Sequence, residues 1–166
     1  MKINGQWAIF LFSVFLLTWG FQKTSSAQQK FNKSVFYTVI ASEDTDAINK
    51  EINLVSEILL NHKEGYEGAL LMKKAGLVVM AKKKLKFFKE GRIKLETALL
   101  ADSDNTEFHF LRLAIQEHAP KIVKYHSSLG NDKLFLQRNF KSLSTEVQHA
   151  ILDYCKNSKI IHAEDF

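Results

Sequence analysis

The chain has 166 residues, of which 46% are hydrophobic and 25% are charged. These values exclude a disordered chain and favour one globular domain of ordinary composition. The formal net charge is +5, and the single proline and seven glycines argue against a turn-rich all-β fold.

Residues 1–27 have the three-part organisation of a secretory signal peptide. Lys2 and the free amino end precede an apolar run over 8–21, and small residues at Ser25 and Ala27 suit signal-peptidase cleavage. The run is shorter than the roughly 20 residues that a membrane-spanning helix needs. We therefore expect cleavage near Ala27 and export to the periplasm or the extracellular space. An uncleaved N-terminal anchor is the alternative.

Cleavage would leave residues 28–166, which we expect to form a single helical domain. Removing Lys2 and Lys23 from the 23 basic residues leaves 21 against 18 acidic ones, or +3. A charge this small does not indicate a nucleic-acid partner. Cys155 is the only cysteine, and its place on the apolar side of a helix predicts burial.

The first part of this domain is predicted to be helical. Residues 31–41 favour a short helix, because their strand-like composition has no evident partner strand. Ser42 or Asp44 can cap the next helix, which carries an apolar stripe at Ile48, Ile52, Val55 and Leu59. A polar turn over residues 61–64 is expected to follow this helix.

Residues 65–80 and 82–101 are expected to form two helices. The first is rich in glycine and alanine, and a helical glycine costs about 1 kcal/mol relative to alanine. Its glycines therefore indicate that a neighbouring helix backbone approaches closely. The second is the longest helix, and its apolar side is supplied by Leu85, Phe88, Ile93, Leu95, Ala98 and Leu99.

The segment from 73 to 94 is the most basic of the chain. It holds nine Lys or Arg residues and one acid, Glu90, so its local charge is +9 − 1 = +8. Such a surface is typical of contacts with anionic lipid or an acidic partner, and also of an ordinary solvated helix face. The candidate contact residues are Lys73, Lys74, Lys82, Lys83, Lys84 and Lys86.

The helix over 107–118 is apolar on most of its circumference and still carries a polar stripe. On a helical wheel, His109, Arg112 and Gln116 share one narrow face. One interpretation is that the stripe holds this central helix in place. The other is that it looks outward and lines a groove that binds a peptide or a carboxylate.

The end of the same helix is expected to be structural. Glu117 and His118 lie among apolar positions beside Pro120, which closes the helix or starts the next one. A carboxylate on an apolar side needs donors, so we expect Glu117 to accept bonds from a neighbouring loop or from a Lys or Arg. The start of the helix can be capped by Asp104 or Asn105.

The remaining chain predicts two more helices after a short segment at 121–126. Asn131 or Asp132 is expected to cap the first, and Ser144 the second, which ends near Asn157. The tail beyond it is expected to be frayed. The sequence thus predicts an all-α bundle of about six to seven helices, arranged as antiparallel hairpins with short loops.

One part of this pattern resembles a repeat family. Gly91, Leu95 and Ala98, followed by DSDNTE at 102–107, resemble the second helix of a tetratricopeptide repeat (TPR) and the loop into the next repeat. The family usually has proline where Ser103 stands, and about one repeat matches. The resemblance implies a TPR-like bundle of helical hairpins.

A second resemblance covers most of residues 28–166. Four segments resemble small exported bacterial proteins with no assigned function: GALLMKKAGL, FKEGRIKLETAL, EFHFLRLAIQEHAPKI and NFKSLSTEVQHAILDY. This resemblance implies an exported protein with a helical fold, and it implies no chemistry.

No motif for catalysis, metal binding or cofactor binding is present. The six histidines show no i, i+4 pair, and no HExxH, GxSxG or glycine-rich phosphate loop occurs. We therefore expect an exported helical binding or scaffold module without catalytic activity, metal or cofactor, with a protein or peptide partner in the envelope. The alternative is a membrane-surface protein that uses the basic segment at 73–94. An enzyme without a recognisable sequence signature also stays open, and the sequence does not indicate the oligomeric state.

Overall fold

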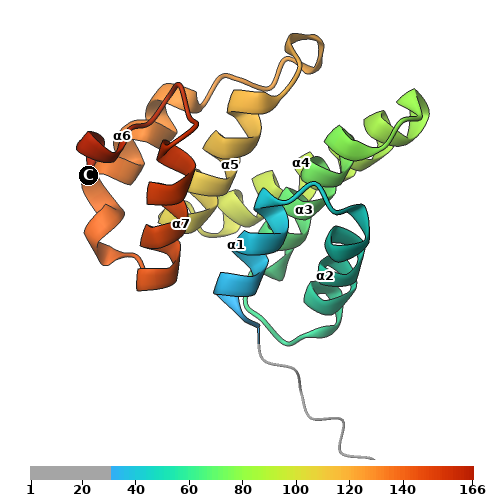
Figure 1. Cartoon of the computed structure of the whole chain (residues 1–166), viewed down its shortest axis with the longest axis horizontal. Helices are drawn as coiled ribbons and strands as arrows, with labels where there is room; N and C mark the ends of the chain where they lie inside the picture. Colours follow the sequence, from blue (N-terminus) through green and yellow to red (C-terminus); the bar gives the residue numbers. More distant parts are fainter. Residues whose placement is uncertain (1–30) are drawn as a thin grey trace, which may run out of the picture.

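A computed structural model describes residues 31–166, which form seven α-helices, three short 3-10 helices and no strand (Figure 1). The all-α prediction is confirmed for these residues. The expected signal peptide over 1–27 lies outside them. The α-helices are α1 (Lys33–Ala41), α2 (Thr45–Glu57), α3 (Lys63–Leu77), α4 (Ala81–Ala101), α5 (Thr106–His118), α6 (Leu129–Asn139) and α7 (Thr145–Cys155), and the 3-10 helices are η1 (Lys121–Val123), η2 (Phe140–Ser142) and η3 (Ala163–Asp165).

Local capping chemistry sets the start of α2 and of α5. The side chain of Asp44 accepts hydrogen bonds from the backbone amides of Asp46 and Ala47, at 2.9 and 3.0 Å, and thereby caps α2. Asn105 accepts from the amide of Phe108 at 3.1 Å and caps α5. Both residues are among those expected to act as caps.

The apolar stripe predicted for α2 is partly wrong at its end. Ile48 and Val55 are fully buried, but the helix stops at Glu57 and the chain becomes extended at Ile58. Ile58 therefore turns inward, while Leu59 is 88% exposed.

Helices α3 and α4 pack against each other at two facing glycines. A Cβ atom built on Gly68 would lie 2.6 Å from the carbonyl oxygen of Gly91, and one built on Gly91 would lie 2.5 Å from that of Gly68. No side chain fits at such distances, so the close backbone approach expected for this pair is confirmed. Leu85 and Ile93, expected on the apolar side of α4, are exposed. Leu85 lies before the crossing, and Ile93 lies on the side of α4 opposite Gly91 and Leu95.

Helix α5 lies at the centre of the described fold. Phe110 packs edge-on to Tyr154 of α7 and near Tyr37 of α1, and Phe108 packs against Tyr66 of α3. The core around these rings draws on every α-helix, and its largest fully buried apolar side chains are Phe36, Phe108, Ile48, Leu70, Leu95, Leu113, Leu136, Ile151, Ile161, Val55 and Val147. Cys155 belongs to the same core, as predicted, and burial raises the pKa of its thiol to about 11.

The structure corrects the expected start of α6. This helix begins at Leu129, after Ser128, so neither Asn131 nor Asp132 caps it. Asp132 instead stands in the first turn and is fully buried. Helix α7 does follow Ser144, whose side chain makes no capping bond.

The expectation of a frayed tail is wrong. Ile161 is fully buried, and the ring of Phe166 stacks on Phe140 at 4.6 Å between centroids. Asp165 pairs with Lys133 at 2.9 Å and accepts a bond from Gln137 at 3.0 Å. These contacts fix the tail on α6 and η2.

Among the helices of residues 31–166, none has both the length and the apolar character that crossing a bilayer requires.

Candidate functional site

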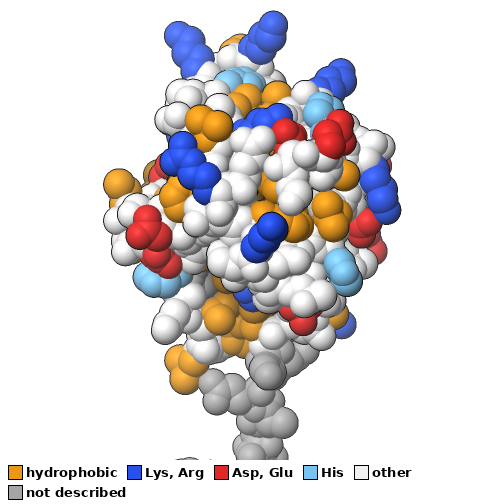
Figure 2. Space-filling model, turned by 90° about the vertical axis from the view of Figure 1, so that its left-hand side faces the viewer, with side chains coloured by type: hydrophobic (Ala, Val, Ile, Leu, Met, Phe, Trp, Pro, Cys, Tyr) orange, Lys and Arg blue, Asp and Glu red, His pale blue; other side chains and the backbone are white. Residues whose placement is uncertain are grey.

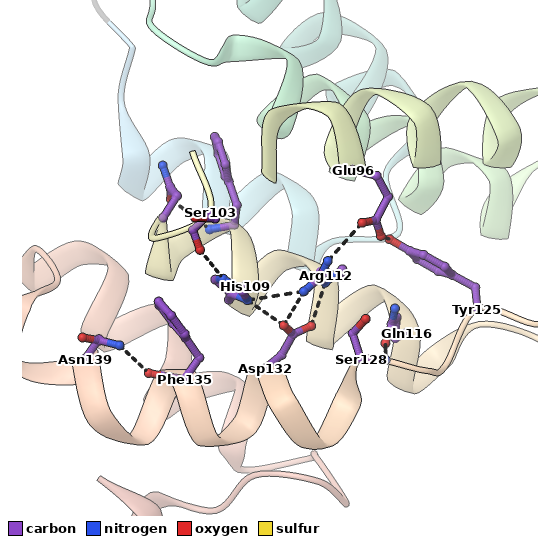
Figure 3. Close-up of polar contacts among 12 residues, drawn as sticks. Glu96, Ser103, His109, Arg112, Gln116, Tyr125, Ser128, Asp132, Phe135 and Asn139 are labelled. Atoms are coloured by element: carbon purple, nitrogen blue, oxygen red, sulfur yellow. Dashed lines mark hydrogen bonds and ion pairs between the residues drawn. The ribbon is translucent and has the colours of Figure 1, made fainter. Parts of the chain in front are cut away.

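The polar stripe of α5 lies inside the fold, in a network that joins three helices (Figure 3). Arg112 of α5 donates from Nε and Nη2 to the two oxygens of Asp132 of α6, at 2.8 and 2.7 Å. Its Nη1 donates to Glu96 of α4 at 3.0 Å. Burial alone would lower the pKa of Arg112, but the hydrogen bonds and charges of both carboxylates outweigh it and raise that pKa. Arg112 thus supplies the charge that buried Asp132 needs.

His109 occupies the other end of this network. Its Nδ1 lies 2.6 Å from an oxygen of Asp132, and its Nε2 lies 2.9 Å from the carbonyl oxygen of Ser103. The ring stacks on Phe135 at 4.1 Å between centroids. Both ring nitrogens are therefore engaged within the protein, and neither is directed at an open surface.

The segment between α5 and α6 contributes further hydrogen bonds to the network. The hydroxyl of Tyr125 donates to Glu96 at 2.6 Å, and the guanidinium of Arg92 lies 4.7 Å from the centre of the same ring. Burial raises the pKa of Tyr125, and the bond to Glu96 raises it further. Gln116 is fully buried, and its Oε1 accepts from the amide of Ser128 at 3.2 Å.

These contacts leave His109, Arg112 and Gln116 facing neighbouring helices rather than a groove. The outward orientation considered for the stripe is not what the structure shows. The physical reason is Asp132, which the sequence interpretation placed at a helix cap and which instead points its charge at Arg112. The sequence did not indicate that this network includes Glu96, Tyr125 and Asp132. An arginine on an otherwise apolar helix was the signal that a carboxylate had to lie nearby.

Glu117 joins α5 to α7 and to the tail. One of its oxygens accepts from the hydroxyls of Tyr154 and Ser158, both at 2.7 Å, and the other from the amide of Lys159 at 2.6 Å. Burial alone would raise the pKa of Glu117, but these three donors outweigh it and hold the pKa below its usual value. The donors are thus a loop amide and two hydroxyls, with no Lys or Arg side chain among them.

The two neighbours of Glu117 in the expected structural set are less enclosed. His118 is exposed, with its Nε2 3.2 Å from the hydroxyl of Tyr154. Pro120 is also exposed and immediately precedes η1, while α5 itself ends at His118.

Glu107 is a further buried carboxylate that the sequence interpretation missed. It lies in the first turn of α5, where the helix dipole favours an acid. It pairs with the ammonium of Lys33 and accepts from the hydroxyl of Tyr37 at 2.9 Å. Burial raises the pKa of Tyr37, and the charge of Glu107 raises it further. The contacts of Glu107 with Lys33 and Tyr37 therefore fix α1 to α5.

The basic segment divides into a packed part and a free part. Lys74 lies 4.4 Å from the ring centre of Phe87, and burial lowers the pKa of Lys73, so these two lysines are not freely available. The outer end of the α3–α4 hairpin, residues 77–90, is here called the basic arm. Its lysines at 82, 83, 84, 86 and 89 are exposed, and no ion pair within residues 31–166 involves them.

The basic arm differs from other parts of the surface. In Figure 1 it extends past the neighbouring helices at the upper right. On the side that carries α6 and α7, basic and acidic side chains are interspersed (Figure 2). The arm therefore combines projection with five exposed lysines against one acid, Glu90.

No cluster of three or more His, Cys, Asp or Glu side chains within residues 31–166 is placed to hold a metal ion. No family model matches the chain, and neither a curated protein nor a solved structure matches it.

Proposed function

We propose that the chain is an exported, non-catalytic helical module that attaches to an anionic surface through its basic arm. The observation that carries this proposal is the exposure of Lys82, Lys83, Lys84 and Lys86 without a carboxylate partner in the described residues. At an anionic membrane, each such lysine contributes about 1 kcal/mol of attraction. The rest of the fold acts as the scaffold that holds the arm out.

The cost of these lysines to folding supports a binding role. Three of them, at 82–84, lie in the first turn of α4, which has no acid, and Met80 at its N-cap makes no side-chain capping bond. Cations at a helix N-terminus oppose the helix dipole by about 0.3–1 kcal/mol each. A sequence shaped by folding stability alone would place acids there.

The polar stripe gives little support to a peptide-binding groove. His109 and Arg112 are bonded to Asp132 of α6, and Gln116 is fully buried, so the arm is the better candidate surface for a partner. Export rests on the sequence of residues 1–27, which predicts that the N-terminus of the protein in the envelope is Gln28. N-terminal sequencing of the protein from that fraction tests this, and an N-terminus at Met1 would contradict it.

We also propose that α3 and α4 form one TPR-like helical pair. Its support is the crossing at Gly68 and Gly91, together with Leu95 and Ala98 buried on the same side of α4. An experimental structure should superpose this pair on a TPR hairpin with the crossing at these glycines. A crossing elsewhere along the pair would contradict the proposal.

Vesicle binding by charge-matched variants tests the arm directly. The chain from Gln28 to Phe166 carries all seven helices and the core that they share, so it is suitable for the assay. One variant replaces four arm residues by Gln, and the control replaces four exposed basic residues elsewhere: Lys82, Lys83, Lys84 and Lys86 in the first, and Lys50, Lys121, Arg138 and Lys141 in the second.

Both variants lose the same net charge, so they separate the arm from overall electrostatics. Co-sedimentation with vesicles of phosphatidylcholine and phosphatidylglycerol should fall strongly for the arm variant and slightly for the control. Equal losses for the two variants, or wild-type binding by the arm variant, would show that the arm is not the attachment surface.

A further inference from the structure

The apex of the basic arm is apolar and exposed. Helix α3 ends at Leu77 and α4 starts at Ala81, so only Val78, Val79 and Met80 connect them. Val79 is 92% exposed and Met80 58%. The apex therefore presents two large apolar side chains to solvent directly beside the exposed lysines of α4.

Folding does not account for these residues. Short connections between helices usually contain Gly, Asn, Asp, Ser or Pro, each of which has a favourable role in a turn. The N-cap position favours Ser, Thr, Asp or Asn, whose side chains bond to free helix amides. Met80 holds that position without such a bond. Single exposed apolar side chains are common, but adjacent ones at a projecting turn require a reason.

Charge and surface area limit which kind of partner can cover the apex. A second copy of the chain would bring two lysine clusters together around the apolar contact, which like-charge repulsion disfavours. A stable protein interface needs about 1,000 Å² or more of buried surface. A three-residue turn and its flanks present a small convex surface, which does not meet that need. An anionic lipid layer can cover the apex without an interface of that size. It offers phosphates to the lysines and an apolar interior to the apex, and it requires no complementary shape.

We infer that Val79 and Met80 insert into the boundary between headgroups and acyl chains of an anionic lipid layer, with Lys82, Lys83 and Lys84 at the level of the phosphates. This inference rests on the proposed function and goes further, since attachment to an anionic surface needs the lysines alone. Lysine side chains suit this geometry, because their alkyl stems lie along apolar surface while the ammonium group stays at the interface.

A single tryptophan tests insertion. Both tryptophans of the chain, Trp7 and Trp19, precede Gln28, so residues 28–166 have none. Val79→Trp therefore places the only indole at the apex. Leu59→Trp is the matched control, since Leu59 is an exposed apolar side chain in the connection between α2 and α3. Vesicles containing phosphatidylglycerol should shift the Val79→Trp emission to the blue and shield it from a soluble quencher, and leave Leu59→Trp unchanged.

Four results in this assay overturn the inference, and the first three concern the two indoles and soluble poly-glutamate. They are an unshifted Val79→Trp emission on vesicles that bind the protein, an equal shift of both indoles, and a Val79→Trp shift that soluble poly-glutamate reproduces, which would assign the apex to an acidic protein. A shift that appears without vesicles and grows with protein concentration would assign it to a second copy, and also overturns the inference.

A polar apex separates this inference from the proposed function. Val79→Ser combined with Met80→Ser should weaken vesicle binding by roughly 10- to 100-fold, from the lost transfer of two apolar side chains. The binding that remains should be abolished by salt. Unchanged binding by this variant, with loss in the lysine variant, overturns insertion and leaves the proposed function standing. Unchanged binding in both variants overturns both.

Discussion

Glu117 shows how one carboxylate fixes two distant parts of the chain. Its three donors come from α7 and from the tail beyond it. The sequence indicated that Glu117 needed donors, because its neighbours on the helix surface are apolar. It could not indicate Tyr154, Ser158 or Lys159, since these lie about 40 residues away and only the packing of α7 brings them close.

Replacing Glu117 by Gln should destabilise the fold by about 1–3 kcal/mol at neutral pH, because an amide cannot accept on both sides. The pKa of Glu117 is lowered from its ordinary value of 4.5, so its contribution is present above that value and is lost as the pH falls through the folded-state pKa. The difference in unfolding free energy between wild type and variant should therefore shrink in acid.

Urea unfolding at several pH values measures this difference. Glu57→Gln, an exposed acid at the end of α2, is the control and should change stability by less than about 0.5 kcal/mol. A difference for Glu117→Gln that is absent at neutral pH, or constant with pH, is incompatible with the observed geometry.

The sequence left two roles open for Arg112, holding its helix in place or binding a partner. The free energy of unfolding of a variant separates these roles. Arg112→Ala leaves the fully buried carboxylate of Asp132 without its cation, and this should cost about 3–5 kcal/mol. Adding Asp132→Ala should recover part of the loss, because the orphaned charge is then removed. The control Arg138→Ala, an exposed position on α6, should have little effect. Thermal unfolding of Arg112→Ala at the wild-type temperature would instead favour an outward, partner-binding arginine.

For the helices, the sequence predicted features that depend on residues close in the chain, and it did not predict those that depend on residues far apart in it. The caps of α2 and α5 were predictable, because a capping bond reaches only two or three residues along the chain. The start of α6 was not, since Asp132 has the composition of a cap and its true partner lies on α5. The ordered tail was missed for the same reason: Asp165 and Phe166 are fixed by α6 and η2 rather than by their neighbours in the chain.

The crossing of α3 and α4 gives a sharp test of packing. Gly68→Ala would place its Cβ against backbone atoms of Gly91 and Leu95, which cannot move without separating the helices. A loss of about 1–3 kcal/mol is expected. Gly76 is the matched control in the same helix, because a Cβ built there would meet no atom within 4 Å beyond its chain neighbours and the backbone of its own helix. Gly76→Ala should be neutral or stabilising by up to about 1 kcal/mol. Similar effects of the two substitutions in chemical unfolding would contradict the close crossing.

The lysines in the first turn of α4 should reduce stability. Replacing Lys82 and Lys83 by Glu should stabilise the fold by about 0.3–1 kcal/mol per residue, since acids suit a helix N-terminus. Lys89→Glu, in the middle of α4, should leave stability nearly unchanged. If calorimetry shows that the Lys82 and Lys83 substitutions lower the melting temperature, these lysines have a structural role that the described contacts do not show.

For the whole molecule, the sequence predicted the helical class and the central place of α5, because apolar residues on most sides of a helix require neighbours on most sides. It did not predict the network of Arg112, Asp132 and Glu96, which exists only once α4, α5 and α6 are assembled. The basic charge of the arm was visible in sequence. Its division into packed and free lysines depends on where α3 ends and on Phe87, and only the fold gives these.

Attachment to an anionic surface through the basic arm is a property of the whole molecule. A salt titration of the chain from Gln28 binding to vesicles of phosphatidylcholine and phosphatidylglycerol tests it most directly. We expect clear binding at low ionic strength that weakens steadily as salt screens the lysines, and little binding to phosphatidylcholine alone. Absence of binding to the anionic vesicles at the lowest salt, in a protein that remains folded, would contradict it.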